Sequence, residues 1–383
     1  MKKRVIILGG GFAGQQAARA LAATDADITL LDPSPVATML PLLPDLAGGW
    51  VRETIAYRPL AQRLPRRVHL IPEAATEIHL AAKTVTLRDQ TLPFDHLLIA
   101  TGSTPNLRRM IFPREKIHVL GNLADARRIR EEFTAYLQEA DAPHILVSGT
   151  GYTGLELAVS LLFRAKAAGK KCGLTIVDPN PILLPSLPEN HRNYVLRFLQ
   201  SHGAEVRLGV AVETYDGHRA TAGGQTYENP FFCWTVGSAF PEVTIHGAGE
   251  RARDGRLHVQ PDLSLPGHPN IFVAGDAAAI TQNDRVLRKA VNFAYYGGRH
   301  AGRNIARQLR GRPTRPFRPV DLGWIVPFHA TSIGRLPGGL WVRGPLGVRL
   351  HHLMCGVRNY SFRNFAGCAR VALTLYKGET QHE

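Results

Sequence analysis

The chain has 383 residues, of which 44% are hydrophobic and 20% are charged, a composition typical of a globular protein and not of a disordered one. Its length exceeds the size at which a single hydrophobic core stops growing, so we expect two or three domains. The 46 Lys and Arg outnumber the 31 Asp and Glu, and the net charge of +15 favours polyanions or an anionic lipid surface as partners.

The four cysteines, Cys172, Cys233, Cys355 and Cys368, form neither a CxxC pair nor the spacing of zinc ligands. We therefore expect no disulfide framework, no metal site and a reducing compartment. No stretch reaches the roughly 18 consecutive apolar residues that a membrane-spanning helix needs, so any membrane contact is expected to be peripheral. The start, MKKRVIILGGGFAG, has a basic end and an apolar run like a signal peptide, but it leads into glycines without a cleavage site and is interpreted as a first strand.

A dinucleotide-binding fingerprint follows that predicted strand. The apolar run of residues 5–8 ends at GGGFAG, and a helix-prone segment comes next. In a strand–turn–helix unit of this kind Gly9 permits the turn, Gly11 lets the backbone approach a pyrophosphate, and Gly14 lets the helix lie close to the strand. Phe12 and Ala13 complete the candidate binding loop.

The second predicted strand, ITLLD, ends at Asp32. This position lies a little over the expected ~20 residues after the fingerprint, where a carboxylate can hold the ribose hydroxyls of a nucleotide. Further along, the segment FDHLLIATGSTPN, residues 94–106, predicts a buried strand that turns sharply at Thr101 and Gly102.

The fingerprint then occurs a second time. The strand HILVS is followed by GTGYTG, with Gly149, Gly151 and Gly154 in the three glycine positions, and by another helix-prone segment. The next strand, LTIVD, ends at Asp178. This second copy predicts a second dinucleotide site on the same chain.

The residues around Asp178 bear on the choice of nucleotide. No arginine immediately follows Asp178 to receive a 2'-phosphate, which favours NADH over NADPH. Lys170 and Lys171 lie nearby in the sequence and leave a strict preference open.

Two further features follow toward the C-terminus. NIFVAGDAAAI, residues 270–280, predicts a strand followed by Gly275 and Asp276. The span 285–318 has no acidic residue and is strongly basic: Arg285, Arg288, Lys289, Arg299, Arg303, Arg307, Arg310, Arg312, Arg315 and Arg318.

The C-terminal segment, residues 349–378, has apolar residues at broadly helical spacing and cationic groups around them. The apolar positions are Leu350, Leu353, Val357, Tyr360, Cys368, Val371 and Leu375; the cationic ones are Arg358, Arg363, Arg370 and Lys377. An amphipathic helix of this kind fits an interfacial anchor on an anionic leaflet. A dimer interface between two copies of the chain and a helix that packs between domains are the alternatives. Nucleic acid is not expected as a partner, because no reader motif accompanies the charge.

Four of these motifs, in their order along the chain, resemble the two-dinucleotide-binding flavoprotein superfamily: the first glycine fingerprint, residues 94–106, the second glycine fingerprint and residues 270–280. That resemblance implies an α/β fold with two Rossmann-like domains, the NAD domain inserted in the FAD domain, plus the basic amphipathic C-terminal segment. It also implies that the first fingerprint and the GD segment hold FAD, that Asp276 contacts its ribityl-pyrophosphate region, and that the internal copy holds a nicotinamide nucleotide. Two such units can hold donor and acceptor rings face to face for hydride transfer.

Within this superfamily, cysteine chemistry argues against two branches. Disulfide reductases have a redox CxxxxC after the first strand, and residues 15–60 contain no cysteine. Sulfide:quinone oxidoreductases place cysteines near the flavin, and neither glycine turn here has one; buried inert thiols are the preferred interpretation.

The chain is most similar to the type II NADH dehydrogenases, single-subunit NADH:quinone oxidoreductases that pump no protons. The segments that carry the resemblance are residues 39–64, TGLELA, residues 179–213, FFCWTVGS and residues 256–280. Residues 39–64 resemble the stretch that crosses the flavin in that family, and Glu156 matches the family's acidic position just inside the NADH-binding helix. Where the family has a quinone-lining AQxAxQ segment, this chain has VNFAYYG, with Asn292 and Tyr296 in place of glutamines.

The resemblance implies a division into an FAD domain of residues 1–110 and 250–320, an NADH domain of residues 111–249, and a membrane-association or dimerisation segment of residues 321–383. It implies hydride transfer from NADH to FAD, then electron transfer to a membrane quinone, at the cytoplasmic face of a bacterial inner membrane. A ferredoxin-like protein acceptor and a redox sensor resembling apoptosis-inducing factor are the alternative functions.

Overall fold

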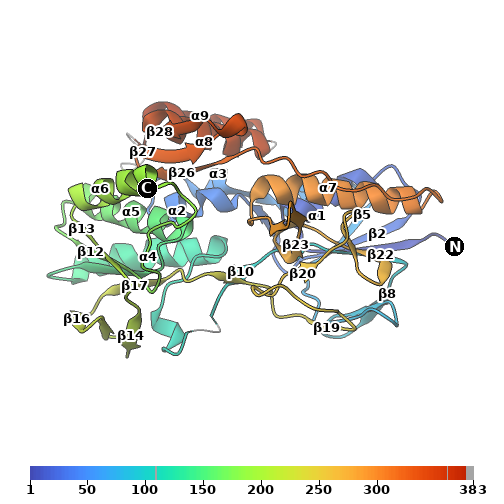
Figure 1. Cartoon of the computed structure of the whole chain (residues 1–383), viewed down its shortest axis with the longest axis horizontal. Helices are drawn as coiled ribbons and strands as arrows, with labels where there is room; N and C mark the ends of the chain where they lie inside the picture. The colour runs from blue at the N-terminus through green and yellow to red at the C-terminus, as the bar shows by residue number, and fades with distance from the viewer. Residues whose placement is uncertain (108–109, 360, 377–383) are drawn as a thin grey trace. The chain divides into compact units, whose positions relative to one another are not determined.

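The computed structural model describes residues 1–107, 110–359 and 361–376. The chain forms two compact units, and Figure 1 shows the course of the chain through them by colour. Unit 1 contains residues 1–37, 58–104 and 238–322, and unit 2 contains residues 38–57, 105–237 and the chain from residue 323 onward. Short strands lie at or beside the points where the chain passes from one unit to the other: β3 (Val36–Thr38), β4 (Tyr57–Pro59), β10 (Thr104–Pro105) and β18 (Ser238–Ala239).

Unit 1 is built on a six-stranded sheet. Its strands are β1 (Arg4–Leu8), β2 (Asp27–Leu31), β5 (Val68–Ile71), β9 (His96–Ile99), β21 (Ser264–Leu265) and β22 (His268–Val273). They lie in the order β21-β22-β9-β1-β2-β5, and all pairs are parallel except β21 with β22. The central strands are apolar on both faces, as parallel strands covered on both sides must be. The loops after β1, β9 and β22 therefore leave the sheet at one edge.

Two helices of unit 1 lie in close contact, α1 (Phe12–Leu21) and α7 (Val291–Gln308). A Cβ at Gly298 would lie 2.1 Å from the carbonyl oxygen of Ala13, and one at Gly302 would lie 2.8 Å from the Cα of Ala17. Glycines one turn apart on α7 thus let its backbone touch that of α1, which fixes the helix that follows the first fingerprint.

The remaining elements of unit 1 are small. A second sheet has the order β19-β6-β7-β8, and its strands are β6 (Glu77–His79), β7 (Thr84–Thr86), β8 (Thr91–Pro93) and β19 (Thr244–His246). The pairs are β20 (Leu257–His258) with β23 (Ala278–Ala279), and β24 (Thr281–Gln282) with β25 (Arg285–Val286). The 3-10 helices are η2 (Leu60–Arg63) and η4 (Gly275–Ala277).

Unit 2 repeats the parallel-sheet design. The strands β11 (His144–Ser148), β12 (Gly173–Asp178), β13 (Ala204–Leu208) and β17 (Phe231–Trp234) lie in the order β13-β12-β11-β17, all in parallel. The unit also contains α4 (Leu123–Glu139), α5 (Tyr152–Ala167), α6 (Glu189–Ser201) and the antiparallel strands β14 (Val212–Tyr215), β15 (Arg219–Ala222) and β16 (Gln225–Glu228). Its 3-10 helices are η1 (Leu40–Leu42), η3 (Arg114–Lys116) and η5 (Pro337–Gly339). The expected α/β fold with two Rossmann-like sheets is confirmed.

Helix α5 is buried on most of its surface because other elements of unit 2 cover it. The short helix α2 (Leu43–Ala47) packs against it, and so does the C-terminal strand β26 (Trp324–Phe328). The stretch LELAVSLL of α5 is apolar on most of its surface and therefore needs such a cover on the side that faces away from the sheet. The cover comes from residues 38–57, which include α3 (Glu53–Ala56), and from the C-terminal segment. Both belong to unit 2, whereas we expected the first in the FAD domain and the second as a separate segment.

The C-terminal segment differs from the single amphipathic helix suggested by its spacing. It forms β26, β27 (Thr331–Arg335) and β28 (Trp341–Arg343), then two mutually packed helices, α8 (Pro345–Arg358) and α9 (Phe362–Thr374). Ser361 caps α9 and ends the continuity of the helix. Cys368 and Val371 are buried, whereas other apolar side chains are exposed: Leu346, Leu353, Met354, Val357, Phe362 and Leu373. Tyr360 and Lys377, two positions of the expected helix, lie outside the described residues.

Among the described residues, no helix has the length and apolar character to cross a lipid bilayer.

Candidate functional site

The first glycine loop, residues 9–14, connects β1 to α1 in a tight turn. Gly9 has a φ of 99°, a left-handed conformation that glycine adopts without strain. A Cβ at Gly14 would lie 1.8 Å from the carbonyl oxygen of Gly9, so no other residue allows the helix to start so close to the strand. A Cβ at Gly11 would meet nothing within 4 Å, and the backbone at this point is open to a ligand. The three expected glycine roles are consistent with this geometry.

Asp32 fastens this loop to the end of β2. Its Oδ2 accepts a hydrogen bond from the Gly10 N–H at 2.5 Å, and its Oδ1 accepts one from the Ser34 N–H at 2.7 Å. Burial raises the pKa of the carboxyl, against the lowering effect of these two hydrogen bonds. Each oxygen keeps a second lone pair, so the carboxylate can still accept a ribose hydroxyl.

The loops after β9 and β22 bring further polar groups to the same edge of the unit 1 sheet. The hydroxyl of Thr101 is buried without a hydrogen-bond partner. Asp276 lies in η4 beside Gly275, and its Oδ2 accepts from the Ser103 hydroxyl at 3.1 Å. Burial raises the pKa of Asp276. An unpaired hydroxyl and a desolvated carboxylate mark a place where a polar ligand group completes the hydrogen bonding.

Lys289 joins this site, and sequence reasoning missed it. Its Nζ donates to the Ser238 hydroxyl at 2.8 Å, and its charge acts on Asp276. Burial lowers the pKa of the ammonium group. In the sequence Lys289 is one of ten basic residues in a run, so nothing distinguished it from the exposed arginines around it.

The second glycine loop, residues 149–154, has the same geometry on the unit 2 sheet. Gly149 has a φ of 114°, and a Cβ at Gly154 would lie 2.3 Å from the carbonyl oxygen of Gly149. A Cβ at Gly151 would meet nothing within 4 Å. The two fingerprints therefore fold into the same turn.

Asp178 holds the second loop as Asp32 holds the first. Its Oδ2 accepts from the N–H and from the hydroxyl of Thr150, both at 2.7 Å, and its Oδ1 accepts from the Asn180 N–H at 2.8 Å. The hydroxyl contact is an addition, because Gly10 occupies the corresponding place in the first loop.

Both helices that follow the loops begin without a side-chain cap. Phe12 is the first residue of α1, followed by the buried Ala13, and Tyr152 is the first residue of α5; neither N-cap position, Gly11 or Gly151, has a side chain to accept from the first-turn N–H groups. Such an open N-terminus suits a pyrophosphate, which accepts from backbone N–H groups and interacts favourably with the helix dipole. The residues at both loops thus fit a dinucleotide.

Glu156 lies in the second turn of α5. Its side chain is partly accessible, and within the described part of the chain no group forms a hydrogen bond or an ion pair with its carboxylate. Burial raises its pKa well above the ordinary value, and the charge of Asp45 raises it further. Burial and this neighbouring charge both favour the protonated form of Glu156, which lies near the second glycine loop.

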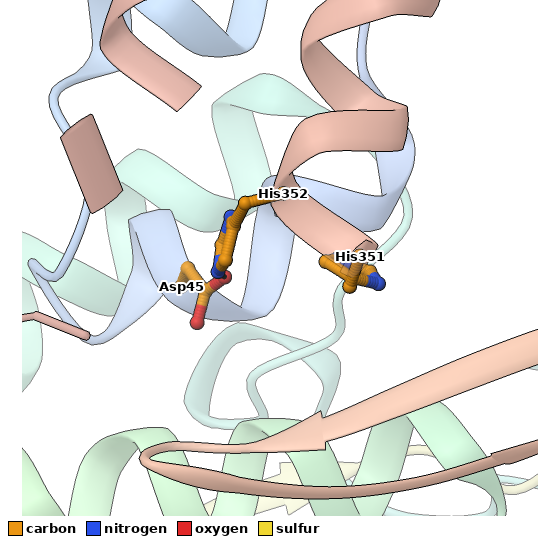
Figure 2. A group of neighbouring side chains, drawn as sticks. All are labelled: Asp45, His351 and His352. Carbon is orange, nitrogen blue, oxygen red and sulfur yellow. Dashed lines mark ion pairs between the residues drawn. The ribbon is translucent and has the colours of Figure 1, made fainter. Parts of the chain in front are cut away.

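A buried polar cluster in unit 2, formed by Asp45, His352 and Tyr376, was not predicted. Figure 2 shows the His352 ring against the Asp45 carboxylate, with His351 to one side. The Tyr376 hydroxyl donates to Asp45 Oδ1 at 3.1 Å and lies 2.8 Å from His352 Nε2. Asp45 comes from α2, His352 from α8 and Tyr376 from the end of the described chain. Residues so far apart in the sequence give no local pattern that identifies the cluster.

Aromatic side chains enclose this cluster. The Trp50 ring contacts that of His329 at 4.5 Å between centroids and that of Tyr376 at 5.9 Å. His329 also stacks on Phe163 of α5 at 4.1 Å. Trp50 Nε1 donates to the Ser160 carbonyl at 2.9 Å. The enclosure excludes water and explains the raised pKa of Asp45, which burial brings to about 7.

The two residues expected beside a quinone, Asn292 and Tyr296, lie on α7 in unit 1 but in different environments. Asn292 is buried, and its Nδ2 donates to the Val320 carbonyl at 3.1 Å. Tyr296 is 42% exposed and lines an open hollow of about 490 Å³ that also includes Arg299, Arg303, Phe317, Arg318 and Leu322. The structure therefore gives Asn292 a packing role and leaves Tyr296 accessible.

In the part of the chain that the structure describes, two clusters have side chains of the metal-ligating types, although the sequence leads us to expect no metal. One is Asp45 with His351 and His352; the other is Glu77 with His79 and His246, where both His Nε2 atoms lie 3.0–3.1 Å from Glu77 Oε2. His351 already hydrogen-bonds to the backbone at Ile325 and Pro41. In the first cluster the hydrogen bonds within the protein account for the arrangement.

The cysteines form no redox pair. All four are free; Cys233, Cys355 and Cys368 are buried and Cys172 is half-buried. Burial raises the pKa of the Cys172 thiol to about 11 and that of Cys368 to about 12. Protonated, buried thiols are poor nucleophiles, which agrees with the interpretation that they are inert.

Comparison with known proteins gives one family and several similar chains. The family model described as pyridine nucleotide-disulphide oxidoreductase matches residues 3–300. The chain is 26% identical over 357 residues to a type II NADH:quinone oxidoreductase of Staphylococcus epidermidis, covering 86% of this chain and 89% of that protein. The structure of NDH2 from Plasmodium falciparum in complex with NADH superposes with a TM-score of 0.86 at 16% identity, over 99% of each chain. The sulfide:quinone oxidoreductase from Aquifex aeolicus gives a TM-score of 0.79 at 20% identity, over 98% of this chain and 96% of that one. At these identities the structures establish the fold.

Proposed function

The chain belongs to the pyridine nucleotide-disulphide oxidoreductase family, and on that premise we propose that it is an FAD-dependent NADH:quinone oxidoreductase that pumps no protons. The observation that carries the proposal is the occurrence of two open glycine loops of the same geometry on one chain whose cysteines form no redox pair. A flavoprotein without a redox disulfide must pass its electrons to an acceptor that binds from outside. The relatedness over most of the chain to type II NADH:quinone oxidoreductases supports a quinone as that acceptor.

Unit 1 is the proposed FAD site. The first glycine loop holds the pyrophosphate, Asp32 the adenine ribose, and Asp276 with Thr101 and Gly102 the middle of the cofactor. The unpaired Thr101 hydroxyl and the side-chain-free N-terminus of α1 support this assignment. Bound FAD supplies the redox chemistry: it takes a hydride from NADH and gives two electrons to a quinone.

Unit 2 is the proposed NADH site. The second glycine loop binds the pyrophosphate at the N-terminus of α5, and Asp178 accepts from the adenine ribose hydroxyls. Asp178 is followed by Pro179, so no arginine is present at the next position to receive a 2'-phosphate. Glu156 is the proposed carboxylate near the nicotinamide.

Tyr296 is the better candidate for a quinone contact than Asn292. Its exposed ring can stack on a quinone or donate through its hydroxyl, whereas the amide of Asn292 is already engaged by Val320. Asn292 instead positions the start of α7.

Helices α8 and α9 are the proposed membrane-associating surface. Their exposed Leu346, Leu353, Val357, Phe362 and Leu373 give an apolar surface, and the exposed Arg349, Arg363 and Arg370 lie on the same two helices. Apolar groups bordered by arginines bind the interface of an anionic leaflet. The proposed location is therefore peripheral, at the cytoplasmic face of a bacterial inner membrane. The same apolar groups in a homodimer interface are the competing explanation.

A visible spectrum of the purified protein tests cofactor, donor and acceptor in sequence. We expect a flavin spectrum that bleaches on anaerobic addition of NADH and returns on addition of a short-chain quinone. Return of the colour with a ferredoxin but not with a quinone would favour a protein as electron acceptor, which would dock on the basic surface. A reduced charge-transfer complex that persists with both acceptors would favour a redox sensor. A colourless protein that takes up no FAD contradicts the proposal.

A further inference from the structure

Three side chains of metal-ligating types lie together on the small sheet of unit 1: Glu77, His79 and His246. Glu77 and His79 are two residues apart on β6, so they point to the same face of that strand. In the parallel pair of β19 with β6, His246 is the partner of His79. Ile78, between Glu77 and His79, is fully buried, so the three side chains lie on the opposite, solvent-exposed face. In Figure 1, β19 lies beside the blue strands of this sheet.

The two imidazole rings converge on one carboxylate oxygen. His79 Nε2 lies 3.1 Å and His246 Nε2 lies 3.0 Å from Glu77 Oε2. The rings are stacked, with centroids 4.2 Å apart and planes inclined by 5°. Two ligand atoms that bind one Zn²⁺ at about 2.0–2.2 Å are about 3 to 3.5 Å apart. All three donor atoms lie within 4.8 Å of one another, so small rotations of the rings bring the two nitrogens to that separation as well.

Glu77 has no lysine or arginine partner, although the chain has 46 of these residues. Within the described ranges its ion pairs are those with His79 and His246. Its neighbours on the same face of the sheet are threonines: Thr84 and Thr86 on β7, and Thr244 on β19. Two neutral imidazoles and one carboxylate together have a single negative charge, which a divalent cation compensates. The local charge therefore favours a cation, in contrast to the net charge of the whole chain.

The kinds of donor atom determine which cation fits. Imidazole nitrogens suit Zn²⁺, Cu²⁺ and Ni²⁺, whereas Ca²⁺ and Mg²⁺ require oxygen ligands. The three side chains are 38–49% exposed, so water can fill the coordination positions that the protein leaves open. When an ion binds, each neutral ring carries its proton on Nδ1 in place of Nε2, and the Nδ1–H donates to water. The cluster thus fits an open, exchangeable site and not the closed four-ligand site of a zinc finger.

An ion in this cluster would join two segments that are far apart in the sequence. Glu77 and His246 are 169 positions apart, and the chain between them includes the whole parallel sheet of unit 2. β19 has three residues and lies at the edge of its sheet, next to β6. So short a strand forms few hydrogen bonds with its neighbour. A second link between the strands would stabilise β19, because a clip that closes a long loop reduces the entropy of the unfolded chain.

We propose that Glu77, His79 and His246 bind a divalent transition-metal cation, with Zn²⁺ as the typical ion, and that this ion links β19 to β6. The inference does not depend on the flavin, on the nucleotide or on the electron acceptor. It departs from the expectation of no metal site, which was based on the spacing of the cysteines. His246 is too far from β6 in the sequence for a spacing motif to include it.

A zinc titration of the full-length protein, purified without a polyhistidine tag and treated with EDTA, tests the proposal. Isothermal titration calorimetry should show one equivalent of bound Zn²⁺, and Mg²⁺ should give no binding. His79→Gln and His246→Gln should each weaken Zn²⁺ binding at least about 100-fold, because loss of an outer-shell partner already costs about 10- to 100-fold. His69→Gln, which changes an exposed histidine of β5 outside the cluster, should bind Zn²⁺ as the wild type does.

Two measurements test the link between the strands. Zn²⁺ at about 100 times its Kd should raise the Tm of the wild type by roughly 2–6 °C and slow amide hydrogen exchange in β19. Neither effect should occur in His79→Gln, although that substitution lies on β6. Glu77→Gln, expected to weaken Zn²⁺ binding equally, serves as the test if a histidine variant loses its fold.

Two results would overturn the inference. Equal Zn²⁺ binding by the wild type and by His79→Gln would place the ion elsewhere, such as at Asp45 with His351 and His352. A wild-type protein that takes up no Zn²⁺ after EDTA treatment would show that the hydrogen bonds to Glu77 are the whole function of the cluster.

Discussion

The two glycine loops have nearly the same geometry, whereas the helices behind them are covered in different ways. In unit 1, α7 lies on α1 through glycine–backbone contacts at Gly298 and Gly302. In unit 2, α5 is covered by α2 and the C-terminal segment, and this cover contributes the buried Asp45, whose charge acts on Glu156 of α5. The two loops thus share one geometry for ligand binding, whereas the cover of each following helix decides which side chains lie behind the loop.

The two sites also differ in the hydrogen bonding of a threonine. In each unit this threonine follows the strand that pairs with the strand before the glycine loop. Thr235, after β17, donates its hydroxyl to the Ser148 carbonyl at 2.8 Å, so the second site is internally satisfied. Thr101, after β9, has a buried hydroxyl with no partner. Unit 1 therefore needs its ligand to complete its hydrogen bonding, as a tightly held cofactor would do, and unit 2 does not, as suits a substrate that must leave.

Matched glycine substitutions should separate the two sites by a large loss of ligand binding at one site or the other. Gly14→Ala should yield protein with little bound flavin, and Gly154→Ala should keep its flavin while its KM for NADH rises about 100-fold. The added Cβ would lie 1.8 Å and 2.3 Å from a carbonyl oxygen, respectively, and relief of such a clash costs about 3 kcal/mol. Flavin absorbance per protein and steady-state kinetics measure the two effects. Loss of flavin in Gly154→Ala would show that the assignment of the two loops is wrong.

The polar cover of α5 should make stability depend on pH through Asp45. Its folded-state pKa of about 7 lies above the unfolded value, so the folded protein keeps a proton that the unfolded chain releases, and this contribution is lost as the pH rises from 4 to 7. Relative to Asp45→Asn, the wild-type free energy of unfolding should fall by up to about 4 kcal/mol over that range. Urea unfolding of both proteins at several pH values measures the difference. Parallel pH dependences would indicate that Asp45 is ionised throughout.

The additional hydrogen bond in the second loop predicts a smaller effect. Thr150→Ala removes the hydroxyl contact to Asp178 Oδ2 at 2.7 Å but keeps the N–H contact, which makes the second loop equivalent to the first. We expect KM for NADH to rise about 5-fold, corresponding to about 1 kcal/mol, with no change in flavin content. Equal loss of flavin and NADH binding would indicate that the fold is disturbed instead.

Effects of similar size are expected at Thr101 and Thr235, with opposite signs for stability. Thr101→Val should leave the stability of the flavin-free protein unchanged or raise it by about 1 kcal/mol, and should weaken flavin binding about 5-fold. Thr235→Val should lower stability by about 1 kcal/mol, because it leaves the Ser148 carbonyl without this donor. Thermal unfolding and flavin titration of the two apoprotein variants measure these effects. A Thr101→Val protein less stable than Thr235→Val would contradict the proposed contrast between the sites.

Local sequence patterns predicted the parts of the sites that are built from short segments. The strands before both loops, the glycine turns, and the acids Asp32 and Asp178 follow from motifs in which each residue has a defined place within about 30 residues. The proposed contact of these two carboxylates with ribose hydroxyls is compatible with the lone pairs that their oxygens keep beside the hydrogen bonds within the protein. The C-terminal helix pattern was less informative, because helical spacing does not show that α8 ends at Arg358 and α9 begins at Phe362, or that Cys368 and Val371 are buried.

The amino-acid sequence alone predicts two dinucleotide-binding units, because the turn, the helix start and the acid of each are encoded by neighbouring residues with strict steric requirements. Only the tertiary structure showed that residues 38–57 and the C-terminal segment cover α5, and that this brings Asp45, His352 and Tyr376 together. The physical reason is that burial and mutual charge, not residue type, set the protonation of these side chains. Both depend on contacts between segments up to 331 residues apart in the chain.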